Sequence, residues 1–239
     1  MARLEPFEAA RRVFEGRYAG ARVLFLAGSV LRGEATPTSD LDVVVVYDRL
    51  PRAYREAFVS DGWPVESFVH DPETLERFIE LDRQSALPSI ISMVLEGVEI
   101  PGPSELSAEL KRLAREAFEA GPPPLIEDEM TLLRFRLTDW LDDIRHPRSA
   151  EELVATGAYL YKDVADFFFR SRNLWTAHSK TVPRRLRQTD PEFAESFRLA
   201  FESLFAAKDP APVIALVEGM LAPFGGLLFE GFRKEAAEK

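Results

Sequence analysis

The pattern of hydrophobic and polar positions changes character near residue 121. Before that point, short β-branched runs alternate with amphipathic segments. The apolar runs at 23–27 and 43–46 predict two strands on either side of a polar loop, and the alternating segment 63–69 predicts a third. The remaining apolar spacings predict a short edge strand at 98–100 and helices over 6–18, 51–60, 87–95 and 104–120, with one more beginning at Asp71-Pro72.

The second half of the chain follows a different pattern, which begins after Gly121-Pro122-Pro123-Pro124. Three prolines cannot continue a helix and hold the backbone extended, so this stretch predicts a domain boundary. Beyond it the strand signals stop, and helical spacing predicts helices over 127–144, 150–175, 191–206, 212–221 and 227–237. The fold class expected is α+β, with a mixed β-sheet flanked by helices in residues 1–120 and an all-α helical bundle in residues 121–239.

Two carboxylates open the second predicted strand. Asp40 and Asp42 are two positions apart, so on a strand they point to the same side, while Leu41 points into the core. Like charges this close repel each other unless a cation lies between them. Because Mg²⁺ prefers carboxylate and phosphate oxygens, we expect Asp40 and Asp42 to be metal ligands.

The first strand ends at a small turn that suits a phosphate group. Gly28 has no Cβ, so a phosphate can approach its backbone closely, and Ser29 adds a hydroxyl and an N–H at the same place. Arg32 follows in the loop and is a further candidate for binding the phosphates. The alternative is a hairpin-like turn with a solvated acidic end, which needs no ligand.

The sequence Ala27-Gly28-Ser29, ten residues, then Asp40-Leu41-Asp42-Val43 resembles the nucleotidyltransferase superfamily that includes polymerase β and the aminoglycoside nucleotidyltransferases. The resemblance implies that Gly28, Ser29 and Ser39 bind the nucleotide and that Asp40 and Asp42 are catalytic. It also implies a third carboxylate on the strand after the acidic pair, as metal ligand or general base. Glu66 is the candidate, against the alternative of an exposed strand glutamate paired with a surface cation.

The second domain offers one further residue through the same resemblance. In aminoglycoside-type members a helix of the C-terminal domain carries a lysine that reaches the triphosphate, and Tyr161-Lys162-Asp163 is similar to that segment. Lys162 is therefore a nucleotide-binding candidate, or else a solvated helix lysine. The basic residues between Lys180 and Arg187 form either a phosphate or partner patch or a solvated turn.

Composition narrows the class of partner. Hydrophobic residues make up 46% and charged residues 29%, as in globular proteins, and the net charge of -10 disfavours a long nucleic acid as ligand. An acidic cleft instead concentrates a cationic small molecule. The chain has no cysteine, no signal-peptide pattern at its start and no apolar run of membrane-spanning length, so we expect a cytoplasmic protein without membrane contact.

The function expected from these features is Mg²⁺-dependent transfer of a nucleoside monophosphate from a nucleoside triphosphate to a hydroxyl of a small molecule. ATP is the expected nucleotide, although no loop residue distinguishes its base, and an aminoglycoside-like antibiotic is the most familiar acceptor, which would make the activity one of antibiotic resistance. The alternatives are a protein- or RNA-modifying transferase of the toxin–antitoxin type and a non-enzymatic nucleotide sensor. A homodimer through the apolar segment 223–229 is left open.

Overall fold

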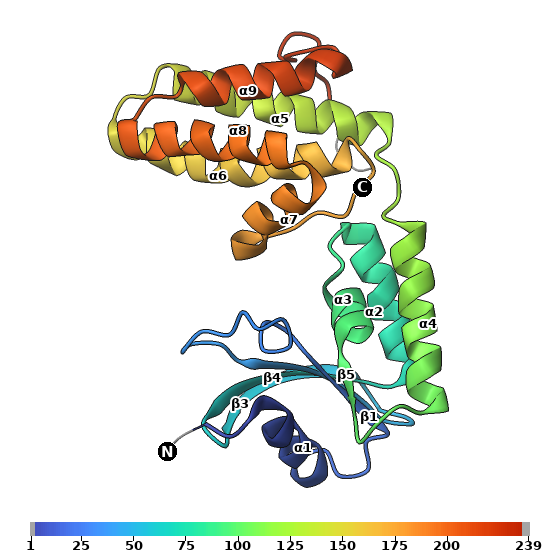
Figure 1. The fold of residues 1–239 in the computed structure, drawn as a ribbon. Coiled ribbons are helices and arrows are strands. Elements are labelled where there is room, and N and C mark those ends of the chain that lie inside the picture. The colour runs from blue at the N-terminus through green and yellow to red at the C-terminus, as the bar shows by residue number, and fades with distance from the viewer. Residues whose placement is uncertain (1–2, 236–239) are drawn as a thin grey trace. The chain divides into compact units, whose positions relative to one another are not determined.

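The computed structural model describes residues 3–235, which divide into two compact units on either side of the Pro122–Pro123 bond. The first unit contains a β-sheet with helices and the second is built of helices (Figure 1). This is the predicted α+β class, with a mixed sheet followed by an all-α region. Within residues 3–235, no helix combines the length and hydropathy that crossing a membrane requires.

The sheet of the first unit has five strands in the order β3-β4-β2-β1-β5. Only β2 and β4 run parallel; the other neighbouring pairs are antiparallel. The parallel pair places Asp42 directly opposite Glu66. The strands are β1 Val23–Ala27, β2 Leu41–Val46, β3 Tyr54–Ser60, β4 Trp63–His70 and β5 Val98–Ile100.

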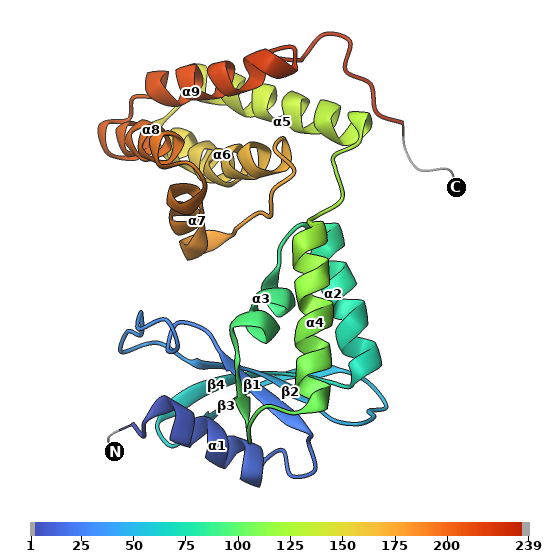
Figure 2. The ribbon, with the colours of Figure 1, turned by 45° about the vertical axis from the view of Figure 1, so that its right-hand side comes forward.

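Helices cover both faces of this sheet. One face carries α1 (Pro6–Gly16), and the other carries α2 (Pro72–Ser85), α3 (Ser89–Glu96) and α4 (Glu105–Ala120) (Figure 2). Alternate strand residues form the core beneath α1, among them Leu41, Val43, Val45, Val65 and Val69. Asp42 and Glu66 lie between these positions, so their side chains point to the opposite face, on the side of α3.

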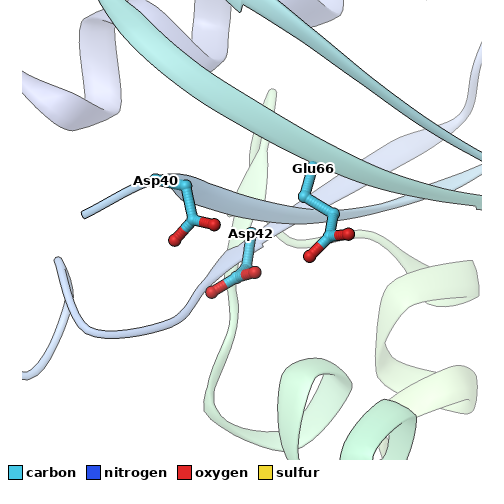
Figure 3. Close-up of side chains that lie close together, drawn as sticks. All are labelled: Asp40, Asp42 and Glu66. Carbon is cyan, nitrogen blue, oxygen red and sulfur yellow. The ribbon is translucent and has the colours of Figure 1, made fainter. Parts of the chain in front are cut away.

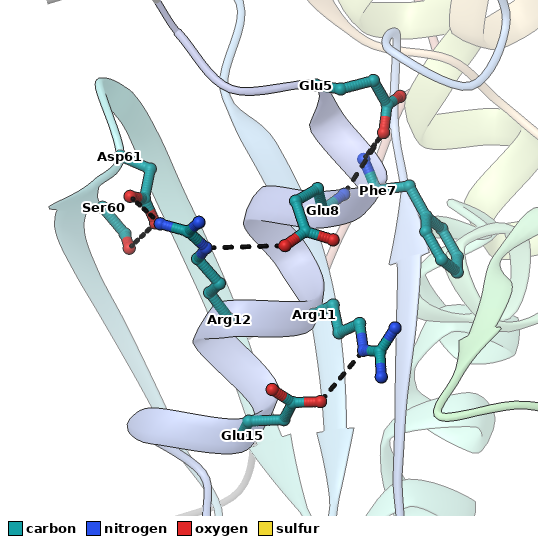
Figure 4. A network of polar contacts seen from close by, with 8 residues as sticks. All are labelled: Glu5, Phe7, Glu8, Arg11, Arg12, Glu15, Ser60 and Asp61. Carbon is teal, nitrogen blue, oxygen red and sulfur yellow. Dashed lines mark hydrogen bonds and ion pairs between the residues drawn. The ribbon is translucent and has the colours of Figure 1, made fainter.

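The helix α1 is tied to the sheet by polar contacts at its polar side (Figure 4). The Glu5 carboxylate accepts hydrogen bonds from the backbone N–H groups of Phe7 and Glu8, at 3.0 and 3.2 Å, and so caps the first turn. Arg12 lies 3.5 Å from the Glu8 carboxylate and 3.3 Å from that of Asp61. Asp61 belongs to the β3–β4 turn, so this ion pair fixes the turn against the helix.

The helix predicted over residues 51–60 is wrong, because Tyr54–Ser60 form strand β3. Asp61 and Gly62 both have positive φ, 49° and 81°, which gives a tight two-residue hairpin between β3 and β4. The inward-facing Glu56 hides the strand pattern, because a polar residue stands where an apolar one is expected. Its carboxylate accepts a 2.8 Å hydrogen bond from the Tyr18 hydroxyl and pairs with Arg17.

The other predicted elements of the first unit are present. Side-chain capping boxes start α2 at Asp71 and α4 at Ser104, which fixes where both helices begin. The apolar run at 87–95 forms α3, whose Ile90, Ile91 and Val94 are buried, and 98–100 forms the edge strand β5.

The second unit is all-α, as predicted, around a core that includes Phe167, Phe168 and Phe169. Helix α7, which contains three arginines in eight residues, was not expected from the sequence. The α-helices of the second unit are α5 Glu127–Arg145, α6 Ala150–Arg170, α7 Val182–Thr189, α8 Pro191–Glu202 and α9 Ala211–Leu221. A π-helical turn lies at Ser203–Ala207, and 3-10 turns lie at Ser179–Thr181 and Ala222–Phe224.

The helix predicted over 227–237 is wrong for residues 227–235, which are irregular, and residues 236 and 237 lie outside the described part of the chain. Gly225 and Gly226 both have positive φ and end the regular structure. Arg134 of α5 donates to both of their carbonyl groups, and the Phe135 ring stacks on Phe232 with ring centres 3.9 Å apart. The segment is therefore held against α5 by individual contacts, and its apolar residues do not form one face of a helix.

A buried histidine at the end of β4 predicts a dependence of stability on pH. His70 is 2% exposed, and burial lowers its pKa to about 4 from a usual value near 6.5. Between pH 6.5 and pH 4 the unfolded chain therefore binds a proton at His70 that the folded chain does not. The contribution of neutral His70 to the free energy of unfolding is complete above pH 6.5 and is lost as the pH falls toward 4. The shift corresponds to roughly 3 kcal/mol.

We therefore expect the free energy of unfolding of the wild type, relative to His70→Leu, to fall by roughly 3 kcal/mol between pH 7 and pH 4. Urea titrations at a series of pH values measure this difference. The exposed His146 supplies the control, since His146→Gln is expected to keep the wild-type slope. A His70→Leu profile parallel to the wild type across this range would contradict the prediction.

Candidate functional site

Three carboxylates, on or next to the neighbouring inner strands β2 and β4, meet near the start of β2 (Figure 3). Asp40 directly precedes β2, Asp42 is the second residue of β2 and Glu66 lies opposite it on β4. Each offers an oxygen, and these oxygens all lie within 4.8 Å of one another. All three residues are half-buried. The structure thus brings together the two aspartates expected as metal ligands and the glutamate expected to join them.

The donor set fits a hard divalent cation. Two oxygens bound to one octahedral Mg²⁺ at about 2.1 Å lie about 3 to 4 Å apart. The carboxylate oxygens of Asp40, Asp42 and Glu66 are already within 4.8 Å, so small side-chain rotations bring them to that spacing. A half-buried group of three acids is also electrostatically costly without a cation, since like charges repel each other. These residues therefore suit Mg²⁺ or Mn²⁺.

One arginine already partly neutralises this group. The Arg55 guanidinium, on β3, forms an ion pair with the Glu66 carboxylate. It also stacks over the Phe68 ring, with its central carbon 5.0 Å from the ring centre. The Arg55 side chain is 64% exposed while that of Glu66 is 24% exposed, so the arginine covers the carboxylate from the solvent side. A cation that binds Glu66 therefore has to share this carboxylate with Arg55 or displace it.

The turn after β1 lies directly against the acidic group. Gly28 has a φ of +88°, a conformation that favours glycine, and a Cβ at this position would lie 2.3 Å from Oδ2 of Asp42. Asp42 is paired with Ala27 across the β1–β2 ladder, so its position is fixed by the sheet. Glycine at position 28 is therefore needed both for the shape of the turn and for the placement of the Asp42 carboxylate.

The polar loop between β1 and β2 is closed by its own hydroxyl groups. The Ser29 hydroxyl donates to that of Ser39 over 3.2 Å, and Ser39 Oγ also accepts the backbone N–H of Thr36 at 2.8 Å. Arg3 donates to the Ser39 carbonyl at 3.2 Å. Ser29 and Ser39, both expected to bind nucleotide, thus lie side by side, next to Gly28 on one side and Asp40 on the other.

The two expected phosphate-binding cations have other partners. Arg32 pairs with the carboxylates of Glu34 at 3.2 Å and Glu96 at 3.0 Å. Lys162 belongs to the second unit, where it is exposed on α6 and pairs with Asp166 one turn later. Their roles toward a nucleotide stay predictions.

Sequence reasoning missed Arg55, because a helix was expected over residues 51–60. The dipeptide Asp61-Gly62 is the signal that identifies the hairpin, since Asp-Gly favours the turn that has positive φ at both positions. Counting back from that turn pairs Arg55 with Phe68 and sets it diagonally beside Glu66. The ion pair follows from that register.

Comparison with known proteins gives one sequence match that covers this site. Residues 11–96 match the sequence model of the nucleotidyltransferase domain family, a range that contains all three carboxylates and the Gly28-Ser29 turn. A solved structure described as a nucleotidyltransferase-like protein from Exiguobacterium sibiricum is similar at 15% sequence identity and a TM-score of 0.45, over 90% of this chain and 74% of that one. No curated protein matches the chain.

Proposed function

We propose, from the match of residues 11–96 to the nucleotidyltransferase domain family, that this chain moves a nucleoside monophosphate from a nucleoside triphosphate to a hydroxyl group in a Mg²⁺-dependent reaction. The family itself implies a nucleoside triphosphate substrate. The observation that supports metal dependence is the meeting of Asp40, Asp42 and Glu66 within 4.8 Å beside a glycine turn.

In this proposal Asp40 and Asp42 hold the metal ion, and Glu66 either completes the ligand set or accepts the proton of the acceptor hydroxyl. When bound, Mg²⁺ would neutralise negative charge on the phosphate oxygens. The backbone N–H groups and hydroxyl of the Gly28-Ser29 turn donate hydrogen bonds to the triphosphate, with Ser39 beside them. This arrangement orients the α-phosphorus toward an attacking hydroxyl, which enters as the pyrophosphate leaves.

Arg32 is proposed as a further phosphate ligand from the same loop. Its present partners, Glu34 and Glu96, are both on the surface, and a triphosphate offers more negative charge than either carboxylate. Lys162 is proposed as a second cation for the phosphates, and to bind them it has to break its ion pair with Asp166. Neither residue is needed to hold the metal ion.

For the acceptor we propose a cationic small molecule with free hydroxyl groups, of the aminoglycoside type. The net charge of -10 supports this choice, because an acidic protein attracts cations and repels polyanions. ATP is proposed as the nucleotide. The intact group of three carboxylates favours catalysis over a sensor that only binds nucleotide.

Label transfer tests this proposal. The protein is incubated with Mg²⁺ and each α-³²P-labelled nucleoside triphosphate, together with a panel of aminoglycosides, with tRNA or with cell protein. We expect label on a small-molecule acceptor and none without Mg²⁺. Label only on tRNA or protein would overturn the acceptor class, and no transfer to any acceptor despite bound nucleotide would overturn the catalytic function.

The Arg55–Glu66 ion pair gives a prediction about metal affinity. Removing the Arg55 charge leaves Glu66 free for the cation, and a unit charge a few ångströms away is worth about 1 kcal/mol in a solvent-like environment. Arg55→Ala is therefore expected to bind Mn²⁺ about three- to tenfold more tightly than the wild type at low salt. Electron paramagnetic resonance of free Mn²⁺ measures this affinity.

The exposed Arg52 on the same segment is the matched control, and Arg52→Ala is expected to leave Mn²⁺ affinity within twofold of the wild type. Weaker Mn²⁺ binding in Arg55→Ala would show that Arg55 orients Glu66 for the metal instead of competing with it.

A further inference from the structure

The second unit contains a cavity that the proposed reaction does not use. It has a volume of about 510 Å³ and lies among α6, α7 and α8, whose places are marked in Figure 1. This is within the range of about 300–1,000 Å³ that is usual for small-molecule sites. Its walls are mainly apolar and include Tyr161, Leu186, Ala194, Phe197, Phe201 and Phe205.

Aromatic rings dominate one wall. Tyr161 meets Phe197 and Phe201 edge to face, with ring centres 4.7 and 4.9 Å apart, and Phe205 continues the row 5.9 Å beyond Phe201. Aromatic rings arranged in this way offer both edges and faces to a further ring. The wall therefore favours a planar aromatic guest over a flexible aliphatic one.

An unusual backbone places the last ring of this wall. Ser203–Ala207 form a π-helical turn after α8, a geometry that is rare and often found at functional sites. The turn approaches α6 so closely that a Cβ on Gly157 would lie 2.4 Å from a methyl group of Leu204 and 3.2 Å from the Phe205 ring. The glycine and the π-turn together bring Phe205 to the cavity.

The two arginines that line the cavity differ in their ion pairs. Arg198 on α8 holds the carboxylates of both Glu195 and Glu202, at 2.7 and 2.6 Å. Arg187 on α7 forms no ion pair with any carboxylate within residues 3–235, and its charge acts on the Tyr161 hydroxyl. The cavity lining thus includes one guanidinium, that of Arg187, without a carboxylate partner among residues 3–235.

The Tyr161 hydroxyl is a second potential donor among the residues that line the cavity. Burial raises the pKa of Tyr161 above its usual value, so the hydroxyl keeps its proton at neutral pH. An anionic group that reaches both residues would accept hydrogen bonds from the Arg187 guanidinium and from the Tyr161 phenol. Hydrogen bonds of this kind, to a charged group, are stronger than those between neutral groups.

From these features we propose that the cavity among α6, α7 and α8 is a binding site for a planar aromatic compound that carries one acidic group. The aromatic part lies against Tyr161, Phe197 and Phe201, and the acidic group lies between Arg187 and the Tyr161 hydroxyl. All the residues that line this cavity belong to the second unit.

Two related fluorescent probes test the proposal on the full chain. The probe 8-anilinonaphthalene-1-sulfonate has an aromatic body and one negative charge, whereas N-phenyl-1-naphthylamine has the same body without the charge. We expect saturable binding of the sulfonate at one site, and a loss of about tenfold or more in its affinity in Arg187→Gln. The affinity for the neutral probe is expected to change less than twofold in this variant.

Arg185→Gln is the matched control, since it removes the same charge from the same helix outside the cavity lining and is expected to leave both affinities unchanged. Ala194→Phe fills the cavity and is expected to abolish both. Should that variant fail to fold by near-ultraviolet circular dichroism, Tyr161→Phe replaces it and is expected to weaken only the sulfonate.

Three results would each overturn the site. The first is the absence of saturable binding of either probe to the folded wild type. The second is an equal loss of sulfonate affinity in Arg187→Gln and Arg185→Gln, which would mean that the probe senses only net charge. The third is wild-type binding in a folded Ala194→Phe, or an unchanged sulfonate affinity in Tyr161→Phe, which would place the probe elsewhere.

Discussion

Asp42→Asn is expected to lose nearly all nucleotide transfer while the protein stays folded. Asparagine keeps the shape of the side chain and the pairing of β2 with its neighbours, but it removes one of the charges that would hold the metal ion. Metal-assisted stabilisation of a phosphoryl transition state is worth several kcal/mol, so kcat/KM should fall by roughly 10²- to 10⁴-fold. Transfer of label from the triphosphate measures the loss, and circular dichroism checks the fold.

Asp48→Asn provides the control, two residues beyond the other end of the same strand. The Asp48 side chain is 70% exposed and pairs with Arg22 at 2.8 Å, so its charge has no part in the acidic group. We expect this variant to transfer nucleotide at the wild-type rate. If Asp42→Asn also transfers nucleotide at the wild-type rate with Mg²⁺ present, the assignment of the metal site is wrong.

Gly28→Ala is expected to cause the second large loss, through geometry alone. The added Cβ would stand 2.3 Å from Oδ2 of Asp42, so the carboxylate has to move. The φ of +88° is also unfavourable for alanine, at a cost of about 1 kcal/mol or more. We expect Mn²⁺ affinity to fall at least about tenfold and transfer to fall with it, since a metal site depends on the position of its ligands.

Gly20→Ala separates strain from displacement. Gly20 has nearly the same φ, +91°, but a Cβ there would meet nothing within 4 Å. Both variants carry the same backbone strain and should lose stability in urea unfolding, but only Gly28→Ala should lose metal binding and activity. Equal activity in the two variants would show that the turn does not set the position of Asp42.

The positions of Asp40 and Asp42 were predictable because they depend on local geometry. Residues two apart on a strand share a face, and the apolar run that follows them fixes the strand. Their meeting with Glu66 was not predictable from periodicity, because it depends on the parallel pairing of β2 with β4. Only the family resemblance suggested Glu66. The resemblance placed Glu66 on the strand after β2, whereas strand β3 comes between β2 and β4 in the sequence.

Two of the three errors, at β3 and at residues 227–235, have one physical cause, which is that polar tertiary contacts stand where an apolar pattern was expected. Glu56 occupies an inward position of β3 because Tyr18 and Arg17 satisfy its carboxylate. In α7, three arginines obscure a short apolar stripe that consists of the buried Val182 and Leu186. Arg134 binds the chain after α9 through backbone carbonyls, which leave no trace in the pattern of side chains.

We propose above all that Asp40 and Asp42 hold a divalent cation against a triphosphate at the Gly28-Ser29 turn. A crystal structure with Mn²⁺ and a non-hydrolysable nucleoside triphosphate tests it most directly, because anomalous scattering locates the metal independently of the model. The prediction is a Mn²⁺ peak within coordination distance of both aspartate carboxylates and of the phosphates, with the triphosphate on the turn. Bound nucleotide with Mn²⁺ away from both aspartates would contradict it.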